Sequence, residues 1–179
     1  MKFSRFDFSL CSKRCKRLVQ VTRHNFIGIS IEINYLVQLV WVRGPGGKEC
    51  LTWAGDQLSW STKNYEYTKI DGRHMKTIIR ASRKSRWIAT QTPEIDLKVI
   101  VDHCKEIFRI PIHDVEFNTD RIENFMEYIP IFSECSTMYL QARNLSEEDI
   151  EAFKDQITVE YKFYLNNKRI KRNKFYWNK

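Results

Sequence analysis

The sequence predicts an α+β fold: an N-terminal antiparallel β meander followed by a leucine-rich-repeat-like β/α ladder. Before residue 91, apolar residues mostly alternate with polar ones, which is the period of half-buried strands. Between residues 92 and 165, three apolar stripes of helical period each lead into a short alternating stretch. Strands in this second part recur about every 21–23 residues, within the range of leucine-rich repeats. A ferredoxin-like or doubly wound sheet would give a similar pattern.

The first predicted element is an amphipathic helix from Phe8 to Val19. Its basic residues lie mostly on one side, as expected of a solvated helix face. Its apolar residues need a partner surface, and little chain precedes them to supply one. These apolar residues are Leu10, Cys11, Cys15, Leu18 and Val19.

The β-rich part begins with the alternating isoleucines of 27–33 and the nearly continuous apolar run 36–42. The segment 44–47 is rich in glycine but lacks the GKS or GKT ending and the following helix of a phosphate-binding loop. It therefore predicts a hairpin turn. Basic residues dominate 73–87, which we interpret as a solvated linker rather than a nucleic-acid-binding patch. Further short strands are expected at 50–53, 58–60 and 65–67.

Three helix-and-strand units are expected in the second part. Thr92 is placed to cap the first helix and Pro93 suits its first turn, while Ser146 followed by Asp149 forms a capping-box signal for the third. The apolar stripes of the three helices run over 97–108, 122–129 and 150–157. The strand after each is marked by Val115 and Phe117, by Met138 and Leu140, and by Val159, Tyr161, Phe163 and Leu165.

The net charge is +8, but it is unevenly distributed. Residues 1–90 carry 17 Lys/Arg and 6 Asp/Glu, residues 91–160 carry 6 and 16, and residues 161–179 carry 7 and 0. An acidic part therefore lies between a basic front and a basic tail. Attraction between the parts is one explanation of this pattern, and affinity for nucleic acid is another.

The cysteines and the absence of targeting signals predict a cytoplasmic and/or nuclear protein. The five cysteines form no CxxC pair and are odd in number, so reduced thiols are expected. Residues 1–8 mix charges with aromatic residues, unlike a signal peptide, and no apolar run is long enough for a membrane span. The basic clusters at 13–17 and 168–172 each resemble a short import signal, and the tail 166–179 is expected to fray.

No motif predicts catalysis, a metal or a cofactor. The four histidines are scattered, with no pair at a spacing of four residues and no Cys/His cluster. His103 and Cys104 are neighbours on the predicted helix and so point in different directions, which argues against a thiol–histidine pair. Motifs such as GxSxG and HExxH are also absent, so we expect a protein that is not an enzyme.

The motifs place the chain near a known family. The stretch from Phe8 to Val19, FSLCSKRCKRLV, resembles the closing helix of a nematode-type F-box. The segments IFRIPI at 107–112 and LSEED at 145–149 are similar to phrases of the F-box-associated domain of type 2, in the same order along the chain. The resemblance divides the chain into an F-box remnant (1–22), the β-rich half of the associated domain (23–91), its β/α repeat half (92–165) and a basic tail (166–179).

Such proteins are substrate receptors of cullin-type ubiquitin ligases. The resemblance implies that the apolar residues of the first helix dock on a Skp-family adaptor and that the associated domain recruits a protein substrate. The family's opening "LP…LxxIL" helices are missing before Phe8, which makes adaptor docking doubtful. A truncated gene model, an alternative transcript or a decaying paralogue would each account for their absence.

The leading hypothesis is thus a non-enzymatic, protein-binding module. If the repeats stack, the polar alternates on their strands would form an exposed face that binds the partner. A basic nucleic-acid-binding protein and a non-functional truncated paralogue are the alternatives, although nucleic acid and membranes are not the expected partners. The predicted partner-binding residues are Glu116, Asn118, Tyr139, Gln141, Glu160 and Lys162.

Overall fold

The computed structural model describes residues 9–45, 49–56, 66–80, 85–90 and 92–170. The strands in these residues are β1 (Gly28–Ile33), β2 (Val37–Arg43), β3 (Glu49–Asp56), β4 (Glu66–Ile70), β5 (Arg73–Arg80), β6 (Ser85–Ala89), β7 (Ile112–Asn118), β8 (Glu134–Gln141), β9 (Thr158–Leu165) and β10 (Lys168–Ile170). The helices are α2 (Lys13–Val21), α3 (Pro93–Phe108), α4 (Glu147–Asp155) and the 3-10 helix η2 (Phe125–Ile131).

All ten of these strands belong to one mixed sheet, in the order β10-β9-β8-β7-β1-β2-β3-β6-β5-β4. β1, β7, β8 and β9 are parallel neighbours, and β3 is parallel to β6. The remaining neighbours are antiparallel. Because β1 pairs with β7, the two predicted halves of the chain share one sheet.

The predicted α+β class is confirmed, but its finer description is not. β1, β2 and β3 form an antiparallel meander, yet the parallel pairing of β3 with β6 shows that the first half is not antiparallel throughout. β7, β8 and β9 follow one another as parallel strands, but the helix predicted over 122–129 is the 3-10 helix η2 with Pro130 inside it. Proline removes a backbone donor, which disfavours a regular α-helix at this point. A leucine-rich-repeat-like ladder is therefore not confirmed.

Two segments without a predicted element form strands. The supposed linker of 73–87 contains β5 and most of β6, with Met75 and Thr77 buried and Lys76 between them more exposed. The prediction was wrong because the many basic residues of the stretch concealed this alternation. In the tail, Asn166 and Asn167 have positive φ values of 47° and 65°, which suit a tight hairpin, so that β10 pairs with β9. The strand expected at 58–60 and the rest of the tail lie outside the described residues.

The core lies between the sheet and the helices, and the predicted stripe of α3 is buried along its length. Phe117 of β7 packs against Tyr128 and Phe132, with ring centroids 5.7 and 5.4 Å apart, and against Phe153 of α4 at 6.0 Å. Helices η2 and α4 therefore cover the face of β7 to which Phe117 points. Tyr161 was expected to share this side, but a shift of register between β8 and β9 leaves it 71% exposed.

Helix ends combine predicted and unpredicted contacts. Ser146 and Asp149 form the expected capping box of α4. Thr92 occupies the N-cap position of α3, but its hydroxyl accepts a hydrogen bond from Arg73 Nη2 at 2.5 Å and caps no backbone amide. The same arginine forms an ion pair with Asp96, so β5 and the start of α3 are joined.

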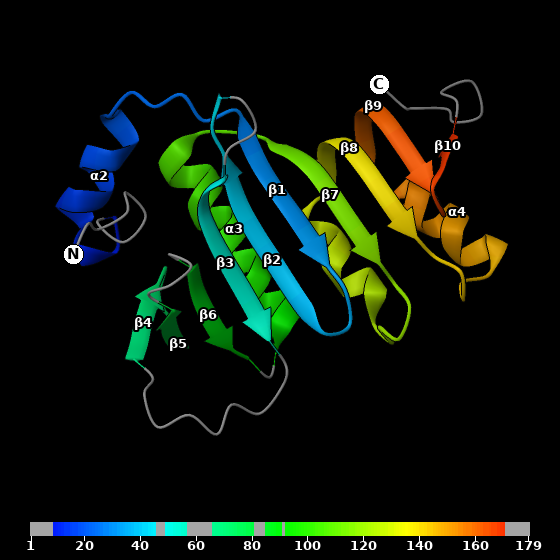
Figure 1. The fold of residues 1–179 in the computed structure, drawn as a ribbon, viewed down its shortest axis with the longest axis horizontal. Coiled ribbons are helices and arrows are strands. Elements are labelled where there is room, and N and C mark those ends of the chain that lie inside the picture. The colour runs from blue at the N-terminus through cyan, green and yellow to red at the C-terminus, as the bar shows by residue number, and fades with distance from the viewer. Residues whose placement is uncertain (1–8, 46–48, 57–65, 81–84, 91, 171–179) are drawn as a thin grey trace.

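No helix of the described residues lies on the opposite face of β1, β2, β7 and β8, as Figure 1 shows: these strands lie in front and α3 behind them. We call this the outer face. In the described residues, no helix is long and apolar enough to cross a membrane.

Candidate functional site

A groove lies on the outer face, where three parallel strands end. β1, β7 and β8 are adjacent and parallel, so their carboxyl ends lie at one edge of the sheet. The groove has a volume of about 320 Å³. We call it the outer groove, and it is lined by Glu32, Ile33, Asn34, Glu116, Phe117, Asn118, Tyr139, Gln141 and Asn167.

Two carboxylates lie side by side in the outer groove. Glu32 of β1 and Glu116 of β7 are partners in the parallel register and lie on the same side of the sheet. Partial burial, followed by the nearby charge of Glu116, raises the pKa of Glu32 above its ordinary value, although a hydrogen bond from Asn34 opposes this. Across the described part of the chain, no Lys or Arg forms an ion pair with either glutamate. Among the described residues, the pair therefore has no cation in direct contact.

An aromatic surface borders this pair. Tyr139 of β8 is the register partner of Glu116 and is 38% exposed. Its ring stacks on that of Tyr164 of β9, with centroids 4.7 Å apart and planes inclined by 5°. Partial burial and then the neighbouring Tyr164 raise the pKa of Tyr139, so its hydroxyl stays protonated at neutral pH. The groove thus combines flat aromatic surface with carboxylates.

Turn residues shape one end of the outer groove. The Asn34 side-chain oxygen accepts hydrogen bonds from the backbone N–H groups of Leu36 and Val37, both at 2.9 Å, and its amide donates to Glu32 at 3.3 Å. Asn118 accepts from the backbone N–H of Asp120 at 2.9 Å. These bonds order the turns that follow β1 and β7.

The structure gathers four of the six predicted partner-binding residues. Glu116, Asn118, Tyr139 and Gln141 line the outer groove. Glu160 and Lys162 of β9 are exposed but lie outside it, and the Ser136 hydroxyl donates to Glu160 at 3.2 Å. Five lining residues were not predicted as partner-binding: the polar Glu32, Asn34 and Asn167, and the buried Ile33 and Phe117. Glu32 and Asn34 could be found only from the pairing of β1 with β7, and no local sequence pattern predicts that pairing.

The predicted adaptor-binding residues do not form a free apolar face. Val19 is only 4% exposed and belongs to the core, and Leu10 packs against the core. Leu18 is 47% exposed, Cys11 is exposed and Cys15 is intermediate. The partner surface that this helix required is supplied within the chain, by α3.

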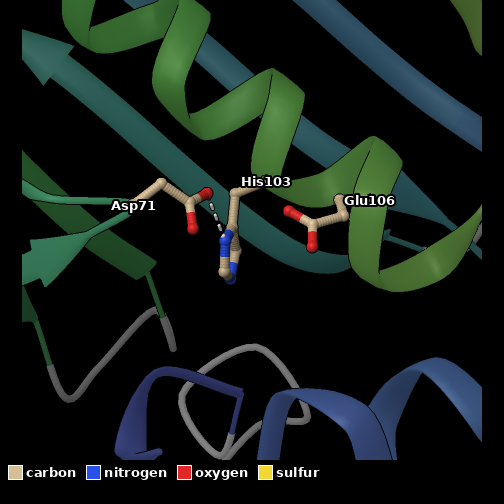
Figure 2. Close-up of side chains that lie close together, drawn as sticks. All are labelled: Asp71, His103 and Glu106. Carbon is tan, nitrogen blue, oxygen red and sulfur yellow. Dashed lines mark hydrogen bonds and ion pairs between the residues drawn. The ribbon is translucent and has the colours of Figure 1, made fainter. Parts of the chain in front are cut away.

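A polar cluster fixes α2 and the residues before it to α3. The Ser9 hydroxyl lies 3.0 Å from His103 Nε2, and His103 Nδ1 lies 2.8 Å from Asp71 in the turn between β4 and β5. Lys16 Nζ lies 2.8 Å from Asp71 and 2.6 Å from Glu106 of α3. We call these five residues the helix clamp; Figure 2 shows three of them, Asp71, His103 and Glu106.

Protonation states follow from the surroundings of the helix clamp. Burial lowers the pKa of His103 and outweighs the opposing hydrogen bond to Asp71, so the neutral imidazole is favoured at neutral pH. Its Nδ1–H then donates to the Asp71 carboxylate, and its Nε2 accepts from the Ser9 hydroxyl. Burial would raise the pKa of Asp71, but hydrogen bonds from Lys16 and His103 together lower it, so this carboxylate is ionised.

The helix clamp resembles two kinds of functional site in its residue types. Asp71, His103 and Glu106 offer ligand atoms within 4.8 Å of one another, a spacing suited to a cation. The Lys16 ammonium already lies between the two carboxylates. Ser9, His103 and Asp71 repeat the order of a hydrolytic triad, but Ser9 and His103 are only 3% and 2% exposed, so a substrate cannot reach them. The arrangement is that of a structural clamp.

Comparison with known proteins gives no relative: no family model, curated protein or solved structure matches the chain.

Proposed function

We propose that this chain is a non-enzymatic protein-binding module whose outer groove captures a protein partner. The observation that carries this proposal is the position of the outer groove on a sheet face that no helix of the described residues covers, with polar lining side chains that lie outside the core, beside the buried Ile33 and Phe117. Polar side chains on a rigid sheet suit recognition, because the strands fix their spacing. In this proposal α3–β7, η2–β8 and α4–β9 act as leucine-rich-repeat-like units that present their strand residues to the partner.

The sequence resemblance supports a more specific role, that of a substrate-receptor subunit of a cullin-type ubiquitin ligase. The partner bound in the outer groove would then be the protein to be ubiquitinated. Docking of a Skp-family adaptor would use the exposed part of α2, including Leu18, because Val19 is buried on α3. A Leu18→Asp variant should keep its fold and lose co-purification with the adaptor. Unchanged co-purification would contradict this role of α2.

Capture of a partner tests the proposed function directly. Tyr139→Ala combined with Gln141→Ala removes two side chains from the outer groove, neither of them fully buried, and should leave the fold intact. Cross-linking followed by mass spectrometry should identify proteins that are linked to the wild-type chain and at least about fivefold depleted with this variant.

The matched control replaces the same residue types elsewhere. Tyr161→Ala with Gln156→Ala alters exposed residues outside the outer groove and should retain the linked proteins. If both double variants retain them equally, the outer groove is not the capture site and the proposed function is wrong. Circular dichroism and urea unfolding of each variant establish that folding is preserved.

A further inference from the structure

We propose that the outer groove binds an arginine side chain from a basic segment of the partner protein, with the guanidinium between Glu32 and Glu116 and against Tyr139. This inference rests on the proposed function and adds the chemistry of the partner. It follows from the charge, the shape and the aromatic border of the outer groove.

The two carboxylates of the outer groove favour a cationic ligand. Glu32 and Glu116 are register partners, and the described part of the chain supplies neither with a Lys or Arg. Asp114, two residues before Glu116 on the same strand, forms an ion pair with Arg43, with 2.9 Å between Oδ2 and Nη1. The outer face thus already accommodates one guanidinium beside a carboxylate. The carboxylate pair in the groove lacks the equivalent partner.

Shape and surface favour arginine over other cations. The volume of about 320 Å³ leaves room for one long side chain with a few waters. A planar guanidinium can donate to two carboxylates and at the same time stack on an aromatic ring. Tyr139 supplies that ring, held by its stack on Tyr164, and Gln141 and Asn118 add hydrogen-bond acceptors. A lysine ammonium would satisfy the charge but gain less from the ring.

The partial burial of Glu32 supports this assignment. Its pKa is raised by burial and by Glu116, so the isolated chain disfavours the charged form of Glu32. A bound cation would favour the charged form. Binding should therefore weaken as the pH falls and Glu32 becomes protonated.

Fluorescence anisotropy of labelled peptides tests the inference on the full chain. Three eight-residue peptides of Gly and Ser carry one central Arg, Lys or citrulline, the last being the neutral analogue of arginine. The Arg peptide should bind more tightly than the Lys peptide, and the citrulline peptide should bind at least about tenfold more weakly than the Arg peptide. Equal binding of the Arg and citrulline peptides would overturn the inference.

Variants locate the binding site. Glu32→Gln with Glu116→Gln should weaken binding of the Arg peptide about tenfold, since the amides keep the shape of the side chains and remove their charge. Glu134→Gln with Glu148→Gln makes the same change of net charge at exposed positions outside the groove and should have little effect. Equal loss in both pairs would show that only net charge matters and would contradict a specific site.

Three further outcomes are decisive. If size-exclusion chromatography shows a dimer that Glu32→Gln with Glu116→Gln abolishes, the occupant is a second copy of this chain and the inference is wrong. If no peptide binds while Tyr139→Ala with Gln141→Ala still loses its cross-linked proteins, the basic partner is wrong but the proposed function stands. If that double variant keeps them, the proposed function itself fails.

Discussion

Two acidic sites in this molecule differ in one respect, which is whether the chain supplies the cation. In the helix clamp, Asp71 and Glu106 flank the ammonium of Lys16, at 2.8 and 2.6 Å. In the outer groove, Glu32 and Glu116 pair across parallel strands, and no cation from the described residues reaches them. The first site is complete and holds a helix in place. We propose that the second receives its cation from a partner.

The difference teaches how to separate structural from functional polar clusters. The residue types of the helix clamp are those of catalytic and metal sites, but its histidine is buried and the Lys16 ammonium pairs with both of its carboxylates. The residue types of the outer groove are unremarkable, but they are open to solvent and only partly satisfied. Whether polar groups already have partners, and whether they are exposed to solvent, therefore says more about their role than residue identity does.

The largest expected effect comes from His103→Ala. This change removes a buried ring that is hydrogen-bonded at both nitrogens and leaves Ser9 and Asp71 without it. We expect a loss of about 2–3 kcal/mol in the free energy of unfolding, measured by urea titration. His74→Ala, at an exposed position, is the control and should change stability by less than about 0.5 kcal/mol. Similar losses in both would contradict a clamp.

The contribution of His103 should also appear, as a smaller effect, in the pH dependence of the free energy of unfolding. The folded state lowers the pKa of His103 below its ordinary value of 6.5, so the unfolded chain takes up the proton first as the pH falls. The stability that neutral His103 contributes is present above pH 6.5 and is lost as the pH falls through the lowered pKa. Charged groups facing it are Asp71, Lys16 and Glu106. In His103→Gln, stability should depend less on pH below 6.5, and an unchanged slope would argue against this residue as the cause.

Lys16→Met should be milder again. It leaves Asp71 and Glu106 without their shared ammonium, and the Lys16 side chain is only 20% exposed. We expect a cost of about 1 kcal/mol, at the upper end for partly exposed pairs, together with faster amide exchange in α2. Lys98→Met breaks a more exposed pair with Asp102 and should cost less. Equal costs would show that α2 does not depend on the Lys16 contacts.

The smallest expected effect has the opposite sign. The raised pKa of Glu32 means that the folded state prefers the protonated carboxyl, so ionisation at neutral pH costs stability. Glu32→Gln should raise stability by less than about 1 kcal/mol at pH 7, because the group is partly exposed. The gain should disappear at a pH well below 4.5, where Glu32 is protonated in both the folded and the unfolded chain. A destabilised variant at pH 7 would indicate that Glu32 already has an internal cationic partner.

Local signals in the sequence determined much of the fold. The apolar stripe of α3, the capping box at Ser146 and the alternation in β1 and β7 depend only on residues a few positions apart. For the same reason Glu116 and Tyr139 could each be placed on the exposed face of its own strand. The stretch 73–87 misled the prediction, because its basic residues hid the strand alternation that buries Met75 and Thr77.

Tertiary structure alone decided which polar residues meet. Ser9 and His103 are 94 positions apart, and His103 and Asp71 are 32 apart, so no local pattern relates them. The outer groove likewise required β1 to pair with β7 across five intervening strands of the chain. The sequence by itself determined the periodic elements and their buried faces, because these depend on near neighbours. The sheet order brought Glu32 to Glu116 and Lys16 to Asp71, because such contacts form only when distant segments pack together.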